Sequence, residues 1–245
     1  MNIKRILLCG SLAAMLCANA NAGSVFVSGD SNIAAVLFGA NDNDVLFENF
    51  LGGGTSVFTL NTSITGSAAT WVSDVDTFYD GLAGVSSTLF TGTFTSADLV
   101  GVDLFVGLAP GNDFTAAEIS ALVGFSQSGG GIFLLGDNAL PPWPDANTRI
   151  NTVLSALGSG MSIINGNVGS GIASGADIIV DPFTTGVVSV AYTAPSEVSG
   201  GNALVLGAGG IPFIAYEDVS VPEPTTLLLL GLSLAGLGFT RRLLH

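Results

Sequence analysis

The stretch "VDLFVGLAPGNDFTAAEISALVGFSQSGGGIFLLGDN" (Val102–Asn138) decides the fold. It opens with the run Val102–Leu108, apolar except for Asp103, that predicts a strand buried on both faces of a sheet. Thr115 and Glu118 follow with the spacing of a capping box, and three glycines end the helix that the box begins. "GIFLLGD" (Gly131–Asp137) is the next predicted strand. A strand, a helix and a strand joined by short loops indicate a parallel sheet covered by helices.

The flanking sequence continues this alternation. The predicted strands are "SVFVSG" (Ser24–Gly29), "SVFTL" (Ser56–Leu60), Ser87–Phe94, "MSIIN" (161–165), "DIIVD" (Asp177–Asp181), "VVSVAY" (187–192), "NALVL" (202–206) and "PFIAYE" (212–217). The other predicted helices are Asp44–Gly52, Ser73–Leu82 and Asn147–Leu157. We therefore expect an α/β fold with a mostly parallel sheet flanked by helices and an antiparallel, β-rich C-terminal part. An all-β sandwich is the alternative.

The N-terminus has the three parts of a secretory signal peptide. Lys4 and Arg5 precede an apolar stretch, and Ala20-Asn21-Ala22 supplies the A-x-A pattern that signal peptidase cleaves. Residues 1–22 are therefore predicted to be a hydrophobic helix that is removed on export. Residues 23–220 are long enough for one sizeable core and are expected to form a single domain.

The composition of this domain excludes several chemistries. Both cysteines lie in the signal peptide, and the single histidine is His245 at the C-terminus. The domain can therefore hold no disulfide, no zinc on Cys and His ligands, and no Cys-His or Ser-His catalytic pair. Arg149 is the one cationic residue of the domain, whereas the domain holds all but one of the chain's 19 acidic residues. Such a charge repels nucleic acid and anionic lipid, and we exclude both as partners of the domain.

The segment Asp98–Asn138, with "DPFTTGVVSV" and "NALVLGAGGIPFIAYE" further on, resembles class I glutamine-amidotransferase-like (flavodoxin-like) α/β domains. In active members of that family the turn after the second strand carries a nucleophilic cysteine, which is later followed by a histidine and a glutamate. Here this turn reads Leu135-Gly136-Asp137-Asn138. The resemblance implies the fold without the amidotransferase activity.

Gly29-Asp30-Ser31, after the first strand, resembles the Gly-Asp-Ser block of secreted esterases of the GDSL group. Those enzymes need a histidine that takes the serine proton, and the domain has none. We therefore interpret these residues as a strand-to-helix turn with a capping side chain.

Asp30 and Asp137 each follow an apolar strand and a glycine. In a parallel sheet the carboxyl ends of neighbouring strands form the usual ligand crevice, so both carboxylates are expected there, with Asn112 or Asp113 from the next loop. Such oxygens suit Ca²⁺ or Mg²⁺, and we predict no other cofactor. The same residue types also serve as helix caps and turn formers, and that alternative stays open. Arg149 is expected to pair with Asp145 or with Asp137.

The C-terminus combines a Pro-Glu-Pro triplet with a short apolar run and two arginines. The run Leu227–Phe239 has 13 residues, and a bilayer-spanning helix usually needs about 20. Such a length suits transient anchoring in a membrane better than permanent anchoring. Arg241 and Arg242 would stay on the cytoplasmic side and halt export of a chain whose domain has already crossed.

The residues Val221-Pro222-Glu223-Pro224, the apolar run and the arginine pair resemble the PEP-CTERM sorting domain of Gram-negative bacteria. The resemblance implies that an exosortase, a membrane transpeptidase, recognises residues 221–245 and removes the tail near the triplet. It further implies transient anchoring in the inner membrane, and then a place at the cell surface or in an extracellular polysaccharide matrix.

Two functional hypotheses follow from the sequence. The first is a non-catalytic protein of the cell surface or of an exopolysaccharide or biofilm matrix. The second is a secreted hydrolase or other carbohydrate-active protein that uses carboxylates alone, with Asp30, Asp137 or Glu118 as candidates. Two carboxyl groups about 5–10 Å apart in one pocket would favour the second hypothesis.

Overall fold

The computed structural model describes residues 23–34, 41–62 and 64–219. The predicted signal peptide and sorting segment, with the hydrophobic helix expected at each end, lie outside the described residues. Among the residues that are described, no helix is both long and apolar enough to cross a membrane.

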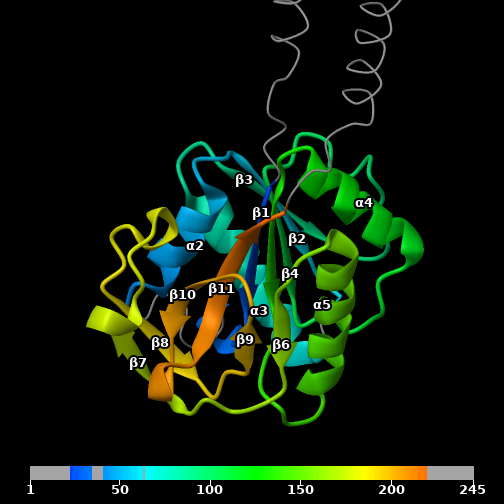
Figure 1. Ribbon diagram of the computed structural model, residues 1–245. Helices are drawn as coiled ribbons and strands as arrows, with labels where there is room; N and C mark the ends of the chain where they lie inside the picture. The colour runs from blue at the N-terminus through cyan, green and yellow to red at the C-terminus, as the bar shows by residue number, and fades with distance from the viewer. Residues whose placement is uncertain (1–22, 35–40, 63, 220–245) are drawn as a thin grey trace, which may run out of the picture.

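A seven-stranded sheet lies at the centre of the domain, in the order β10-β11-β1-β5-β4-β2-β3 (Figure 1). Its strands are β1 (Ser24–Ser28), β2 (Ser56–Leu60), β3 (Ser86–Phe90), β4 (Leu104–Leu108), β5 (Gly131–Leu135), β10 (Asn202–Leu206) and β11 (Pro212–Asp218). The strands β1 to β5 are parallel, whereas β11 is antiparallel to β1 and to β10. This sheet confirms the predicted α/β class and rules out an all-β sandwich.

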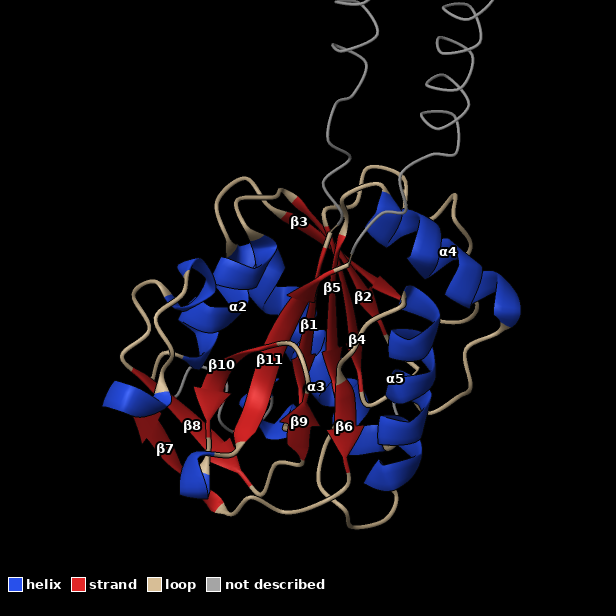
Figure 2. Cartoon of the chain, viewed as in Figure 1, coloured by secondary structure: helices blue, strands red, loops and turns tan. Residues whose placement is uncertain are grey.

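Helices cover both faces of the sheet (Figure 2). The helices α2 (Asn43–Leu51) and α3 (Gly66–Gly81) pack on one face, and α4 (Ala116–Gln127) and α5 (Trp143–Leu157) pack on the other. Successive strand residues point to opposite faces, so the inner strands β1, β2, β4 and β5 each contribute to two separate cores. In β1, for example, Phe26 packs with α2 and α3, whereas Val25 and Val27 pack with α5. This two-sided burial is why the strands read as continuous apolar runs.

The local helix signals act as the sequence predicts. Thr115 caps α4 and accepts a hydrogen bond from the backbone N–H of Glu118, while the Glu118 carboxylate accepts one from the backbone N–H of Thr115. Gly158 ends α5 in the left-handed conformation, with φ of 75°. However, α5 begins at Trp143, earlier than the predicted Asn147, because Pro144 suits the first turn of a helix.

The C-terminal part is rich in antiparallel strands, as predicted, although its details differ. The strands β6 (Ser162–Ile164) and β9 (Glu197–Ser199) form one small pair, and β7 (Ser170–Ser174) and β8 (Ser189–Thr193) form another. The strand predicted at Asp177–Asp181 is wrong, since only Ile178 makes an isolated bridge, to Val205. The short 3₁₀ helices η2 (Gly175–Asp177) and η3 (Pro182–Thr184) flank this segment, and Asp181 caps the second of them.

The five parallel strands give the sheet two distinct edges. At the amino edge these strands begin, and at the carboxyl edge they end. Chain connections leave β1 and β2 toward α2 and α3, but leave β4 and β5 toward α4 and α5. The carboxyl edge therefore has two switch points, one between β1 and β5 and one between β2 and β4, where ligand crevices form in open sheets.

Candidate functional site

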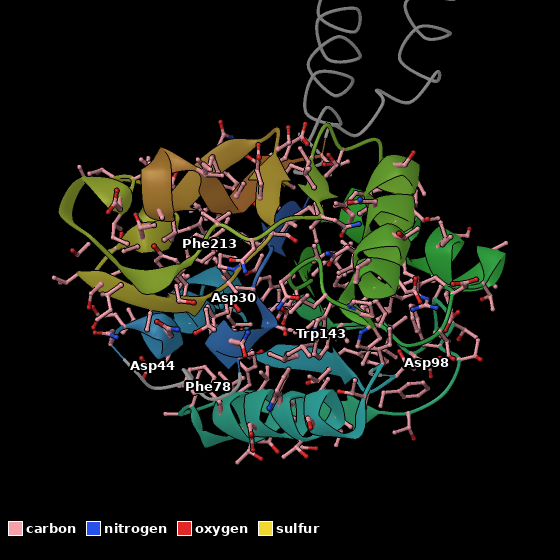
Figure 3. All side chains as sticks on the ribbon, turned by 90° about the horizontal axis from the view of Figure 1, so that it is seen from below. Asp30, Asp44, Phe78, Asp98, Trp143 and Phe213 are labelled. Carbon is pink, nitrogen blue, oxygen red and sulfur yellow. The ribbon has the colours of Figure 1, made fainter. Side chains whose placement is uncertain are left out.

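Asp30 and Asp137 lie together at the first switch point, as their positions after β1 and β5 predict. Both are buried, with exposures of 0% and 1%. Figure 3 views the domain from the carboxyl edge and labels Asp30 there. The two carboxyl groups are thus brought together inside the domain, and they do not face an open crevice.

The glycine before each aspartate explains this burial. A Cβ on Gly29 would lie 2.0 Å from the carbonyl oxygen of Ser196, and one on Gly136 would lie 2.2 Å from Oδ1 of Asn147. Only glycine lets these neighbours approach so closely. Ser196 and Asn147 then hydrogen-bond to the Asp137 backbone and close the site from outside.

Backbone amides hold the Asp30 carboxyl group. The N–H of Asn32 donates to Oδ1 at 2.8 Å, and the N–H of Thr193, at the end of β8, donates to Oδ2 at 2.7 Å. Burial disfavours the charged form more than these bonds favour it, and the neighbouring Asp137 adds repulsion, so the pKa of Asp30 rises to about 7. Asp30 therefore ties the β7/β8 pair to the main sheet.

The Asp137 carboxyl group is held by side chains as well as by the backbone. Ser31 donates its hydroxyl to Oδ2, and Asn138 donates its backbone N–H and its Nδ2 to Oδ1, each at 2.7 Å. Burial raises the pKa of this carboxyl group also. Ser31 is itself fully buried, so its hydroxyl serves this contact and is closed off from solvent.

Asp113 and Asn112 belong to the second switch point, apart from the buried pair. An open pocket of about 690 Å³ lies there, which we name the carboxyl-edge pocket. Its lining comes from the segments that follow β2, β3 and β4, namely Leu60, Asn61, Thr62, Ile64, Gly92, Thr93, Gly111, Asn112, Asp113, Phe114, Thr115 and Glu118. The predicted site residues are therefore separated in the structure. Asp30 and Asp137 form the buried pair, whereas Asn112 and Asp113 line the open pocket.

Arg149 joins α5 to this pocket. Its Nε lies 2.8 Å from Oδ1 of Asp113, and its Nη1 donates to the carbonyl oxygen of Pro110 at 3.2 Å. The predicted pairing of Arg149 with Asp145 or Asp137 is therefore wrong. The helix α5 turns Arg149 toward the loop after β4, a direction that sequence spacing does not reveal.

Glu118 also lines the carboxyl-edge pocket, but its two oxygens have structural partners. Oε1 accepts a hydrogen bond from the N–H of Phe94, and Oε2 accepts from the N–H and the hydroxyl of Thr115. Within the described residues, no three His, Cys, Asp or Glu side chains come together as a metal site would require. Binding of Ca²⁺ at Asp30, Asp113 or Asp137 stays a prediction.

Sequence reasoning missed one feature of the carboxyl edge. Trp71 of α3 and Trp143 of α5 stack there, with ring centroids 5.9 Å apart and planes at 21° (Figure 3 labels Trp143). Both rings are partly buried and pack on the α2/α3 core. The prolines before Trp143 indicate a fixed loop. However, Trp71 lies 72 positions earlier in the chain, and only packing across the sheet edge brings it to Trp143.

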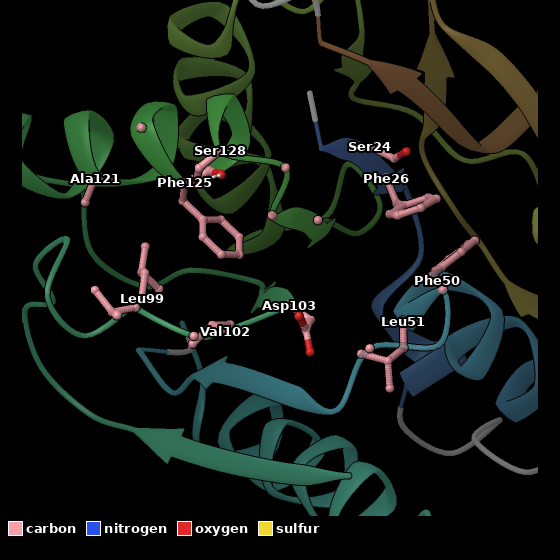
Figure 4. Close-up of a pocket in the computed structure, with 18 of the residues that line it drawn as sticks. Ser24, Phe26, Phe50, Leu51, Leu99, Val102, Asp103, Ala121, Phe125 and Ser128 are labelled. Atoms are coloured by element: carbon pink, nitrogen blue, oxygen red, sulfur yellow. Dashed lines mark hydrogen bonds between the residues drawn. The ribbon is translucent and has the colours of Figure 1, made fainter. Parts of the chain in front are cut away.

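The amino edge carries a second depression, of about 840 Å³, which we name the amino-edge groove (Figure 4). Phe26, Phe50, Leu51, Leu99, Val102 and Phe125 provide apolar walls, and glycines 129–131 form part of the lining. Asp103 lies among them, and its Oδ2 accepts hydrogen bonds from the N–H groups of Thr55 and Ser56. No sequence pattern predicts a site at this edge.

Comparison with known proteins bears on the tail more than on the domain. Residues 220–242 match the family model of the PEP-CTERM protein-sorting motif. No curated protein matches the chain. One solved structure, described as "mmIFT52 N-terminal domain", is similar over 68% of this chain and 81% of its own, with 15% sequence identity and a TM-score of 0.45.

The matched segment contains Val221–Pro224, Arg241 and Arg242, and the motif indicates an exported protein that is processed by an exosortase. The chain therefore combines an α/β domain with a C-terminal sorting motif. The resemblance to class I glutamine-amidotransferase-like domains rests on the sequence alone.

Proposed function

We propose that this chain is a non-catalytic protein of the cell surface or exopolysaccharide matrix, and that it acts by binding an uncharged, hydroxyl-rich polymer. The observation that carries the proposal is the chemistry of the carboxyl-edge pocket. Asn61, Thr62, Thr93 and Asn112 offer amide and hydroxyl groups to it, and each such group can both donate and accept hydrogen bonds. Phe114 adds an apolar wall.

Charge argues for a neutral ligand. Arg149 is the one cation among the described residues, and it is engaged by Asp113 and Pro110. A pocket that contains Asp113 and Glu118 and offers no free cation disfavours anionic polymers. A neutral saccharide, with hydroxyl groups that donate and accept, matches such a lining.

The alternative, a carboxylate-dependent hydrolase, has less support. It needs two available carboxyl groups facing one pocket. Asp30 and Asp137 are buried among hydrogen-bond donors, and both oxygens of Glu118 accept bonds from their own surroundings. This alternative would instead be supported if the protein released reducing ends from a neutral polysaccharide and the Glu118→Gln variant did not.

Calorimetry tests the proposal. It measures binding of the processed, exported protein to neutral and to acidic exopolysaccharides from the producing cells. We expect heat with the neutral polymer alone, and loss of at least about tenfold in affinity for Asn61→Ala with Asn112→Ala, because each lost hydrogen bond is worth about 1 kcal/mol. Asn202→Ala is the matched control, since Asn202 is exposed on β10 at the other side of the sheet. Equal binding by all three proteins would contradict the proposal.

A further inference from the structure

Both ends of the described chain leave the domain at the amino edge. Ser24, at the start of β1, pairs with Asp218, at the end of β11, and its hydroxyl donates to Oδ1 of Asp218 at 2.6 Å. Val219 packs in the α4/α5 core with an exposure of 8%. The chain is therefore held in place up to the residue before the matched sorting motif (β1 and β11 in Figure 1).

The sorting triplet begins very close to this anchored point. Pro222 follows Val219 by three residues, which can span at most about 11 Å even when fully extended. A membrane transpeptidase that processes the chain near Pro222–Pro224 must therefore approach the amino edge of the folded domain. The motif match indicates that this enzyme is an exosortase, so the inference rests on exosortase processing.

The amino-edge groove has the chemistry of a protein contact at this place. Among the described residues that line it, Asp103 is the one charged side chain, and its carboxylate is engaged by two backbone amides. Val100 lies on the same lining and is 81% exposed. The groove mixes apolar side chains with serines and glycines and is nearly uncharged, whereas the chain has a formal charge of −14. A depression of this kind with an exposed apolar residue such as Val100 is typical of an interaction site.

We propose that the amino-edge groove is a docking surface for the exosortase that processes the tail. Ser24 lines the groove and pairs with Asp218, so the short connection after Val219 limits how far the Pro-Glu-Pro triplet can lie from an enzyme held there. Contact with the folded domain thus adds to recognition of the tail, because a second contact joined by a short tether raises the effective concentration of the first.

Matched substitutions in the full chain, expressed in the exporting cells, test this proposal. Val100→Asp places a charge on the groove, whereas Val188→Asp places the same charge on a valine that is 72% exposed beside β8. The intact mass of the pulse-labelled exported protein gives the rate of tail removal. We expect Val100→Asp to slow removal at least about fivefold and Val188→Asp to leave it unchanged, with equal melting temperatures for both variants.

A linker insertion distinguishes docking from other causes of slower tail removal. A flexible Gly/Ser insert of about twelve residues after Val219 lowers the effective concentration. The insert should slow processing of the unsubstituted chain and make it insensitive to Val100→Asp. Processing of Val100→Asp at the unsubstituted rate, without the insert, would overturn the docking surface. Retention of the tail by the unsubstituted chain would instead overturn exosortase processing itself.

Discussion

The hydroxyl of Ser31 donates a hydrogen bond to the carboxyl group of Asp137, which lies 106 residues further along the chain. This contact joins the turn after β1 to the turn after β5, and the Asp30 carboxyl group in the first turn accepts hydrogen bonds from Thr193 and Asn32 instead. The two turns that a parallel sheet would leave open are thereby closed on each other. The first switch point is consequently part of the core, and the carboxyl-edge pocket is the accessible one.

The buried acid pair gives the domain a stability that depends on pH. Asp30 has a pKa of about 7 when folded and 3.8 as the reference for the unfolded chain, so the folded state binds the proton more tightly. The contribution to the free energy of unfolding is full below about pH 4 and is lost as pH rises to about 7. Urea unfolding of the mature protein between pH 4 and 8 measures this fall in the free energy of unfolding. Because each pKa unit corresponds to about 1.4 kcal/mol, the fall should amount to a few kcal/mol.

Asp30→Asn should reduce that pH dependence, because an amide does not titrate in this range, and the part that arises from Asp137 should remain. Asp145→Asn is the matched control, since Asp145 is exposed in the first turn of α5. An unchanged slope in Asp30→Asn, with the control also unchanged, would show that the slope arises elsewhere.

Gly136→Ala should destabilise the domain by about 1–3 kcal/mol, since the new methyl group would lie 2.2 Å from Oδ1 of Asn147 and 2.6 Å from Cδ1 of Ile163. Gly124→Ala should instead be neutral or stabilising by up to about 1 kcal/mol, because Gly124 lies within α4 with nothing near its Cβ position. Thermal and urea unfolding of the two variants compare them directly. Equal stabilities would mean that the turn around Asp137 relaxes freely.

The ion pair between Arg149 and Asp113 should contribute little to stability. The Asp113 side chain is 90% exposed, and exposed pairs are worth about 0.2–1 kcal/mol. A double-mutant cycle with Arg149→Gln and Asp113→Asn isolates the coupling energy, which should shrink further at high salt. A coupling above about 2 kcal/mol that persists at high salt would contradict the exposed geometry.

The stacked tryptophans should give an exciton signal in far-UV circular dichroism. They are the chain's only two tryptophans, so Trp71→Phe and Trp143→Phe should each abolish the same signal. Tyr192→Phe serves as a control, because Tyr192 packs on Phe213 in the core instead. Persistence of the signal in either tryptophan variant would mean that the two rings do not stack in solution.

Most of the fold was predictable because its signals are local. The apolar runs of β4 and β5, the capping box at Thr115 and Glu118, and the glycine after α5 each depend on a few neighbouring residues. The prediction failed at Asp177–Asp181, where an apolar segment finds no strand partner beyond one bridge. Strand pairing depends on distant residues, so a short apolar run alone does not determine it.

The candidate sites were predictable only in part. The positions of Asp30 and Asp137 after two strands placed them at one edge of the sheet, and β1 and β5 are indeed neighbours. Nothing in the sequence around them showed that Ser196 and Asn147 would close over that edge. The carboxyl-edge pocket draws its lining from three separate loops, and the amino-edge groove from still more.

The sequence by itself determined the α/β class, the absence of Cys and His from residues 23–220, and the sorting motif, because these follow from composition and short contiguous patterns. The tertiary structure decided which carboxyl groups are buried, which partner Arg149 takes, and where both chain ends leave the domain. The physical reason is that burial and pairing depend on residues many tens of positions apart. These residues meet only when the sheet forms and its loops pack against one another.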